Sequence, residues 1–333
     1  MKLKISEFGK TAEGEQIVLY NLKNEFVDLE VISLGGIITT LKTADKNKKY
    51  ENIILKHNTI KEYEKDEFFY GCIVGRVAGR TKDGILKINN STYKLEKNNG
   101  GNNLHGGTKG LNRKNWSGSA SILDEKGIIV LKYKSPHLES NFPGEVVFEV
   151  KYILEKNTLT IEYSGISDRD TYINLTNHTY FNLSGDAKNT IKNNLLKINA
   201  KGYGWVDEET LPQKMEREDS FIKFKTFEKL ENIFETNHEQ VKIVGGGIDH
   251  PFELSKDSEF DIELKDEESG RSIKVKTTEP VAVVYTGNFL DKKHNGICFE
   301  TQDYPDVFNF MPEKAKLYNN ELKYNTKTIF YFN

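Results

Sequence analysis

The segment Val146-Val147-Phe148-Glu149-Val150-Lys151-Tyr152-Ile153-Leu154 shows the pattern that decides the fold. Every second residue from Val146 to Leu154 is apolar, whereas Glu149 and Lys151 occupy alternate positions. Because alternate side chains of an extended strand point to the same face, this segment is predicted to be a β-strand with one buried face and one solvated face.

The same alternation recurs along the chain. Residues 158–164 show it, residues 260–277 show it twice around a loop that contains Gly270, and residues 328–332 show it at the end of the sequence. Two alternating runs joined by such a loop are typical of a β-hairpin. Helical spacing is scarce and predicts only two short helices, at 59–66 and 225–234. We therefore predict an all-β fold, a large antiparallel β-sandwich whose two sheets both contribute to the core.

The organisation and composition narrow the class of protein. No proline-rich or Gly/Ser linker divides residues 1–333, which are predicted to form a single domain. The 47 basic and 50 acidic residues give a net charge of −3, and the lysines are dispersed, which argues against nucleic acid as a partner. The amino terminus lacks a signal-peptide core, and no apolar run approaches the ~20 residues of a membrane span. A cytoplasmic protein without a membrane partner is therefore expected.

Two cysteines, Cys72 and Cys298, supply no readable disulfide framework. Cys72 lies in the apolar run 68–74 and is interpreted as a small buried hydrophobic residue.

An unusually polar strand is predicted at Ile173-Asn174-Leu175-Thr176-Asn177-His178-Thr179-Tyr180-Phe181-Asn182-Leu183. On an extended backbone, Thr176, His178, Tyr180 and Asn182 would share one face. Each of these polar groups needs a partner when buried, and a ligand covered in hydroxyl groups can supply such partners. A sugar-like substrate is the first functional hypothesis.

The seven histidines differ in their sequence context. His178 belongs to the polar strand, and His105 lies in the Asn- and Gly-rich segment 98–107. His250 follows Asp249 in a second glycine-rich segment, 245–252, and is as readily a turn residue as a ligand contact. The other four are expected to be structural or surface residues: His57, His137, His238 and His294. No HExxH or comparable metal pattern is present, and neither glycine-rich segment has the spacing of a phosphate-binding loop.

A carboxylate follows an apolar strand near the end of the chain. Glu300 comes directly after Ile297-Cys298-Phe299, and Gln302 lies on the same side if the strand continues. A buried carboxylate is costly unless it is paired or used; the alternative is a glutamate that reaches solvent from the strand end. Together, Glu300 and His178 suggest general acid–base chemistry.

Two of the few arginines, Arg76 and Arg80, lie four residues apart among small residues. Either guanidinium can hold hydroxyl or carboxylate oxygens in a pocket, and a structural salt bridge is the alternative for each. An aromatic ring such as Tyr180, Phe289 or Trp116 can cover the apolar face of a sugar, with core packing as the alternative.

Six segments occur in a fixed order: Gly75-Arg76-Val77-Ala78-Gly79-Arg80, Asn103-Leu104-His105-Gly106-Gly107, Asn177-His178-Thr179-Tyr180-Phe181-Asn182-Leu183, Asp249-His250-Pro251-Phe252, Tyr285-Thr286-Gly287-Asn288-Phe289-Leu290, and Glu300-Thr301-Gln302 followed by Pro305-Asp306. Together they resemble the aldose 1-epimerase family, the galactose mutarotases. The resemblance implies a β-supersandwich with an open sugar-binding cleft. It also implies interconversion of the α and β anomers of free hexoses such as galactose and glucose, without a cofactor or metal.

The resemblance assigns a role to each matching residue. Glu300 is expected to remove the proton from the C1 hydroxyl, and His178 to protonate the ring oxygen. His105 is expected to assist near the ring oxygen, while Arg80 and Asp249 hold hydroxyl groups. Arg76 and Gln302 are further candidates for substrate contacts. The oligomeric state, monomer or homodimer, stays open.

Two positions depart from the pattern that the resemblance implies. Many family members carry Asn where this chain has Gly79, and some carry Gln just before the Tyr285 segment, where this chain has the apolar run 281–284. Both changes remove possible polar contacts to the sugar. The catalytic pair is unaffected, and the preferred hexose stays open.

Two alternatives compete with the epimerase. A non-catalytic carbohydrate-binding or sensing protein on the same fold would need the hydroxyl-binding residues but not both proton-transfer groups. A glycosidase or polysaccharide lyase is disfavoured, because a glycosidase normally needs two carboxylates flanking the bond. Only Glu300 stands out here, with Asp249 as a weak second.

Overall fold

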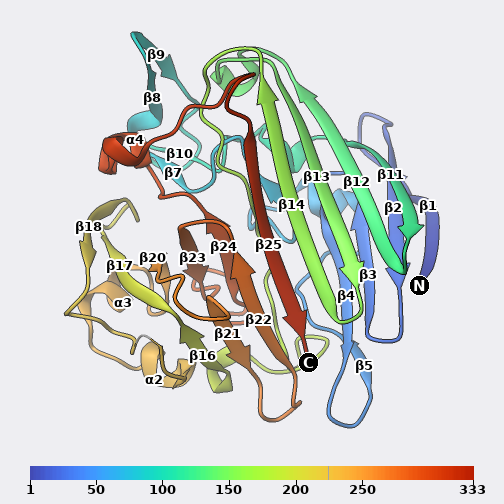
Figure 1. The fold of residues 1–333 in the computed structure, drawn as a ribbon. Helices are drawn as coiled ribbons and strands as arrows, with labels where there is room; N and C mark the ends of the chain where they lie inside the picture. Colours follow the sequence, from blue (N-terminus) through green and yellow to red (C-terminus); the bar gives the residue numbers. More distant parts are fainter. Residues whose placement is uncertain (224) are drawn as a thin grey trace.

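A nine-stranded antiparallel sheet is the largest layer of the computed structural model, which describes residues 1–223 and 225–333 (Figure 1). In strand β13 the alternating pattern corresponds to one buried face: every second residue from Val146 to Leu154 is fully buried, as predicted. The predicted hairpin at 260–277 is the β21–β22 pair. In spatial order the strands are β11 (Ser117–Leu123), β12 (Lys126–Ser135), β13 (Val146–Glu155), β14 (Thr158–Ser167), β25 (Tyr324–Phe332), β22 (Ser272–Thr277), β21 (Ile262–Lys265), β16 (Leu195–Ile198) and β19 (Glu228–Lys229).

The amino-terminal strands form a second layer behind β12 to β14 (Figure 1). They form an antiparallel meander of β1 (Lys2–Lys10), β2 (Gln16–Lys23), β3 (Val27–Ile32), β4 (Ile38–Ala44) and β5 (Tyr50–Asn52). Leu29 and Leu41 of this layer belong to the same buried cluster as Phe148 and Tyr152 of β13. The predicted β-sandwich is therefore confirmed, with its core between the two sheets.

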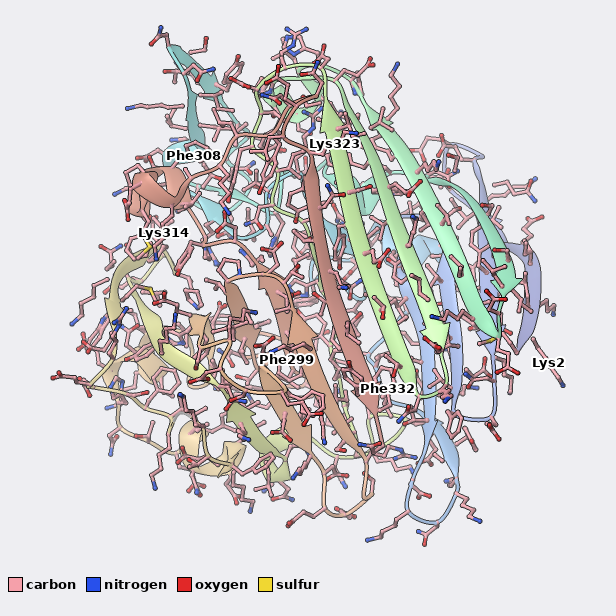
Figure 2. The ribbon with its side chains drawn as sticks, viewed as in Figure 1. Lys2, Phe299, Phe308, Lys314, Lys323 and Phe332 are labelled. Atoms are coloured by element: carbon pink, nitrogen blue, oxygen red, sulfur yellow. The ribbon has the colours of Figure 1, made fainter. Side chains whose placement is uncertain are left out.

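A third antiparallel sheet, of five strands, carries much of the candidate site. Its strands are, in order, β18 (Pro212–Glu216), β17 (Ala200–Val206), β20 (Asp249–Leu254), β23 (Val281–Tyr285) and β24 (Cys298–Gln302). Phe252, Val284 and Phe299 extend the main hydrophobic cluster into this sheet. Figure 2 shows Phe299 among packed strands, whereas the Lys2 side chain projects from the edge of the molecule. This shared core supports the single domain predicted for residues 1–333, which stays a prediction.

Short elements connect the sheets. Three two-stranded pairs join β6 (Ile73–Val74) to β15 (Thr176–Asn177), β7 (Arg80–Thr81) to β10 (Asn103–Leu104), and β8 (Ile85–Ile88) to β9 (Ser91–Lys94). The α-helices of the described residues are α1 (Ile60–Glu64), α2 (Leu230–Phe234), α3 (Glu239–Ile243) and α4 (Val307–Phe310). Single 3-10 turns are η1 (Lys82–Gly84), η2 (Leu111–Arg113), η3 (Glu139–Asn141), η4 (Ile191–Asn193) and η5 (Pro312–Lys314).

The predicted helices are found in part. Helix α1 lies inside 59–66 and begins with a capping box, in which Thr59 and Glu62 bond each other's backbone N–H groups. Only the last five residues of 225–234 are helical, because Glu228 and Lys229 pair with β16 instead. No helix within residues 1–223 and 225–333 is both long enough and apolar enough to cross a membrane.

The polar segment 173–183 is not the continuous strand that was predicted. Only Thr176 and Asn177 pair as a strand, with β6. The Asn177 side chain accepts hydrogen bonds from the backbone N–H and the hydroxyl of Thr179, which bends the chain. Such a local side-chain bond competes with strand pairing. After Asn177 the segment continues as a loop, in which Phe181 makes single β-bridges to Ile54 and Ile297.

Candidate active site

A cleft of about 350 Å³ opens where the third sheet meets the loops that carry the glycine-rich segments. This volume lies within the range typical of small-molecule sites. Polar and apolar residues both line the cleft. Its polar lining comprises Glu67, Arg80, Asn99, His105, His178, Tyr180, Asp249, Tyr285 and Glu300, and its other lining residues are Phe68, Phe69, Gly79, Leu104, Val283 and Phe289.

Strand pairing positions Glu300 at the base of the cleft. Glu300 of β24 lies directly opposite Val283 of β23, and β23 in turn places Tyr285 opposite Asp249 of β20. Glu300 is only 3% exposed, and its Oε2 has no hydrogen-bond partner among the described residues. The alternative of a glutamate that reaches solvent is therefore wrong, and one carboxylate oxygen is left for a ligand.

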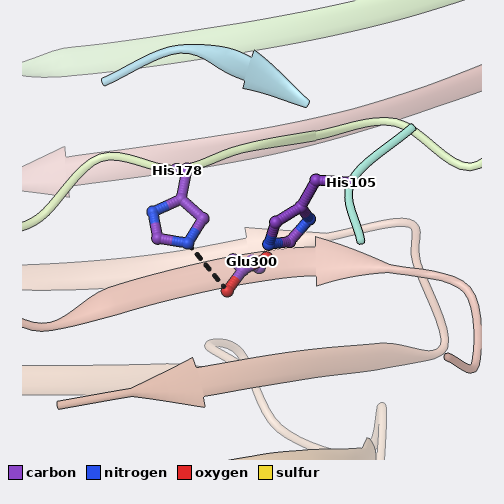
Figure 3. Close-up of side chains that lie close together, drawn as sticks. All are labelled: His105, His178 and Glu300. Atoms are coloured by element: carbon purple, nitrogen blue, oxygen red, sulfur yellow. Dashed lines mark ion pairs between the residues drawn. The ribbon is translucent and has the colours of Figure 1, made fainter. Parts of the chain in front are cut away.

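The loop after β15 brings His178 against Glu300. Nε2 of His178 lies 3.5 Å from Oε1 of Glu300, as the dashed line in Figure 3 marks. The backbone N–H of His178 donates to the carbonyl of Cys72 at 2.9 Å, which anchors the loop. The other ring nitrogen, Nδ1, lies 3.5 Å from Sγ of Cys298. Each imidazole nitrogen thus faces a different partner.

His105 approaches the same carboxyl from the turn after β10 (Figure 3). Its backbone is left-handed, with φ of 55°, and its Nδ1 accepts a hydrogen bond of 3.2 Å from the backbone N–H of Gly79. A nitrogen that accepts is unprotonated, so the neutral ring carries its proton on Nε2. His105 therefore presents a hydrogen-bond donor to the cleft.

The turn itself depends on a glycine. The backbone of Gly106 has a φ of +85°, and a Cβ atom at this residue would lie 2.2 Å from the carbonyl oxygen of Gly75. Only glycine fits such a close approach at this φ, which explains the glycine after His105 in the predicted site loop.

Arg80 and Asp249 both line the cleft, and their predicted contacts with hydroxyl groups stay a prediction. Arg80 follows Gly79 directly, and its Nε donates to the side-chain oxygen of Asn99 at 3.1 Å. Asp249 begins β20. Burial raises the pKa of the Asp249 carboxyl, while the charge of Arg80 opposes that rise. This part of the cleft can therefore bind hydroxyl groups through donors and acceptors together.

Burial shifts the pKa values of Glu300 and His178 in opposite directions. Burial, followed by repulsion from Asp249, raises the pKa of Glu300 to about 8, against the attraction of Arg80. Burial lowers the pKa of His178 to about 4, and it also lowers the pKa of His105 well below its usual range, helped by neighbouring positive charge. Near neutral pH without a sugar, the transferable proton of the pair therefore resides on Glu300, and His178 is neutral.

His105, His178 and Glu300 also form a group whose potential ligand atoms lie within 4.8 Å of one another. Two imidazoles and a carboxylate are a common metal-binding set. However, the proton on Nε2 of His105, enforced by the Gly79 N–H, must be lost before that nitrogen can bind a cation. The group is therefore better suited to donating a hydrogen bond and exchanging protons than to holding a metal ion.

Two predicted substrate contacts are not brought to the cleft. The Arg76 guanidinium is buried on another side, where it donates to the Ser135 hydroxyl and to the carbonyls of Pro136, Pro143 and Gly144. This placement contradicts the predicted substrate contact of Arg76 and gives it a structural role, with no salt bridge to any residue that the structure describes. Gln302 is fully buried and donates to the carbonyl of Asp303 at 3.1 Å. It lies behind Gly79 rather than lining the cleft.

The polar face predicted on segment 173–183 is divided by the bend at Asn177. His178 and Tyr180 line the cleft, but Thr176 does not, and the Asn182 amide donates to the carbonyls of Asn189 and Asn295. His250 also faces away from the cleft, since its Nε2 lies 3.2 Å from Oε1 of Gln240.

Two of the three aromatic candidates lie at the cleft, and the third lies in the core. Tyr180 lines the cleft, Phe289 lies at its mouth with 63% of its surface exposed, and Trp116 is a core residue that donates to the Leu111 carbonyl. Phe69 and Tyr285 were missed as lining residues. Tyr285 begins one of the six matching segments, a signal that was available, whereas nothing distinguishes Phe69 from the apolar run around it.

Comparisons with known proteins show which family the chain resembles. The family model described as aldose 1-epimerase matches residues 18–331. A galactose mutarotase from Sus scrofa is 32% identical, and the match covers 98% of this chain and 97% of that protein. An aldose 1-epimerase from Haemophilus influenzae is 30% identical over 75% of this chain and 76% of that protein. A crystal structure of galactose 1-epimerase from Lactobacillus acidophilus superposes with a TM-score of 0.89 and 26% identity, covering 100% and 99% of the two chains.

Proposed function

This chain belongs to the aldose 1-epimerase family, and we infer that it is a mutarotase that interconverts the α and β anomers of free hexoses such as galactose and glucose. The alternative of a non-catalytic sugar-binding protein lacks support, because the cleft holds both groups needed for proton transfer. The substrate is a small sugar, and the identity of the favoured hexose belongs to the proposal.

One observation carries the assignment of the catalytic residues: Nε2 of His178 and Oε1 of Glu300 are 3.5 Å apart in the cleft. In a pyranose, the ring oxygen and the anomeric hydroxyl are bonded to the same carbon, C1. An acid and a base that serve these two oxygens must therefore be neighbours themselves. Geometry of this kind is the first requirement for general acid–base catalysis.

The proposed cycle moves one proton between the two side chains. Glu300 takes the proton of the C1 hydroxyl while the His178 imidazolium gives its Nε2 proton to the ring oxygen, and the C1–O5 bond breaks to give the open aldehyde. The C1–C2 bond then rotates. In reclosure, Glu300 returns its proton to the former carbonyl oxygen and His178 takes the proton of the attacking hydroxyl, which yields the other anomer.

The pKa order of the free site fits one half of this cycle. The state with a protonated Glu300 and a neutral His178 is the state that follows ring opening. To start from the cyclic sugar, the proton must move to His178. Hydrogen bonds from the C1 hydroxyl to the carboxylate, and from the imidazolium to the ring oxygen, favour that charged state.

The remaining polar residues position the sugar. The Nε2–H of His105 points a donor toward the ring-oxygen region, while Arg80 and Asp249 bind hydroxyl groups. Val283 places an isopropyl group beside Glu300, and Gly79 offers only its backbone. These two positions are proposed to shape the preference among hexoses.

Polarimetry on freshly dissolved α-galactose and α-glucose tests the function. The enzyme is expected to accelerate the decay of optical rotation to its equilibrium value in proportion to its concentration. Sugar binding without any acceleration would instead identify a binding protein. Rates for galactose, glucose, xylose and their 6-phosphates would then define the preferred substrate.

A further inference from the structure

Cys298 lies behind the candidate acid, on the side of His178 that faces away from the cleft. It is two residues before Glu300 on β24, so both side chains leave the strand on the same face. Its Sγ lies 3.5 Å from Nδ1 of His178, and the residue is fully buried. The same strand therefore contacts both nitrogens of one imidazole, with the carboxyl at Nε2 and the thiol at Nδ1.

The tautomer of His178 matters for the proposed function, on which this inference rests. A neutral imidazole carries one proton, on either Nδ1 or Nε2. If the proton is on Nε2, its donation to the ring oxygen leaves an imidazolate anion, which is a very poor product. If Nδ1 keeps its proton throughout, Nε2 alternates between imidazolium N–H and neutral acceptor, and the cycle passes through no anion on the ring.

The surroundings favour a proton on Nδ1. The carboxyl of Glu300 holds the transferable proton in the free site and faces Nε2, which is then the acceptor. The remaining ring proton faces the sulfur of Cys298. Burial raises the pKa of the Cys298 thiol well above its usual range, so the thiol stays uncharged. A neutral sulfur can accept a weak hydrogen bond.

We propose that Cys298 is a positioning residue whose sulfur accepts the Nδ1–H of His178 and so keeps Nε2 as the nitrogen that exchanges a proton with the sugar. A thiol suits this position better than a carboxylate does. A carboxylate at Nδ1 would stabilise the imidazolium and weaken it as an acid, whereas an uncharged, weakly accepting sulfur fixes the tautomer without that penalty. The ring is also held by Tyr180 and Phe69, with centroids 4.9 and 5.8 Å away.

The tautomer can be read directly by NMR. The full-length protein is labelled with 15N-histidine, and two- and three-bond 1H–15N correlations distinguish a protonated Nδ1 from a protonated Nε2. The His178 signals are assigned by their loss in His178→Gln. Near neutral pH, the wild-type protein is expected to show protonated Nδ1 and unprotonated Nε2.

Two matched variants test the role of the sulfur. Cys298→Ser keeps a group that can accept the Nδ1 proton, so it should keep the tautomer and a kcat within about threefold of wild type. Cys298→Ala removes the acceptor, so it should shift the tautomer toward Nε2–H and lower kcat by about tenfold with KM unchanged. Circular dichroism checks that each variant is folded.

The outcomes separate this inference from the function itself. A wild-type spectrum with the proton on Nε2 would overturn the inference even if Cys298→Ala failed to fold. A Cys298→Ala protein with unchanged tautomer and kcat would overturn it as well. If the wild-type protein has no mutarotase activity, the proposed function is refuted, whichever tautomer of His178 the spectrum shows.

Discussion

Nε2 of His178 and Oε1 of Glu300 meet at 3.5 Å although the two side chains are anchored by different parts of the fold. The loop of His178 is anchored by a backbone hydrogen bond to the carbonyl of Cys72, whereas Glu300 is fixed by the pairing of β24 with β23. The contact therefore depends on how the loop docks against the third sheet. It is a tertiary feature that neither segment specifies alone.

Removing either member of this pair should abolish most of the activity. Glu300→Gln and His178→Ala are each expected to lower kcat/KM by roughly 100- to 10,000-fold, the range for one general acid or base. Polarimetry measures the rate, and circular dichroism checks the fold. Glu279→Gln is a matched control, because Glu279 is also buried with a pKa raised by burial to about 7 but lies outside the cleft. Near-normal turnover in Glu300→Gln would remove the assignment.

The pH dependence should be bell-shaped with a broad plateau. Catalysis needs one transferable proton on the His178–Glu300 pair. With pKa values of about 4 and about 8, the pair holds two protons below the lower value and none above the upper value. The ratio kcat/KM should therefore fall below about pH 4 and above about pH 8. A profile of kcat/KM that stays level from pH 7 to pH 10 would contradict this account.

Substitution of Arg80 should weaken substrate binding, whereas substitution of Arg76 should lower the stability of the fold. Arg80→Met is expected to raise KM about tenfold or more, because a donor to hydroxyl groups is lost, and to change the free energy of unfolding by less than about 1 kcal/mol. Arg76→Met should lower the free energy of unfolding by about 3 kcal/mol or more, because it orphans buried carbonyls and the Ser135 hydroxyl. Its KM should be unchanged. Urea denaturation and polarimetry measure both quantities, and a raised KM in Arg76→Met would count against its structural role.

Glu300 should also make stability depend on pH. Its pKa in the folded protein is raised from 4.5 to about 8, so the bound proton stabilises the folded state below pH 4.5 and this contribution is lost as the pH rises through 8. Glu300→Gln removes this titration. Between about pH 5.5 and pH 8.5, the variant should lose less stability than wild type, by on the order of 3 kcal/mol at ~1.4 kcal/mol for each pKa unit.

Urea denaturation at the two pH values measures this difference. An equal loss in both proteins would show that Glu300 is not desolvated in the folded state. Part of the wild-type loss should persist in the variant, because Glu279 also has a raised pKa.

The strands were the most predictable part of the molecule. Alternation marked β13 and the β21–β22 hairpin correctly, because each has one face on the core and one toward solvent. The segment 173–183 was predicted less well. Its alternation is genuine, but the Asn177 side chain bonds to Thr179 and ends the strand after two residues. Local side-chain bonds of this kind compete with strand pairing and leave little trace in an apolar pattern.

Site residues could be predicted where the chemistry of the side chain identifies them, but not where tertiary contacts decide which way the side chain points. A polar strand face pointed to His178, a carboxylate after an apolar strand pointed to Glu300, and both side chains line the cleft. Arg76 carries the same chemistry as Arg80, but the direction of its guanidinium is set by the carbonyls of distant loops. Cys298 looked like an ordinary apolar strand residue, because its contact with His178 exists only in the folded chain.

The central claim is that His178 and Glu300 act as one unit on the two oxygens of C1, and a double-variant measurement tests it most directly. Polarimetric kcat/KM is compared for His178→Ala, Glu300→Gln and the combination of both. Groups that act together lose their joint effect once either is removed, so the double variant should lie within about tenfold of the slower single variant. A double variant whose loss equals the product of the two single losses would show that the residues act independently, and would contradict the account.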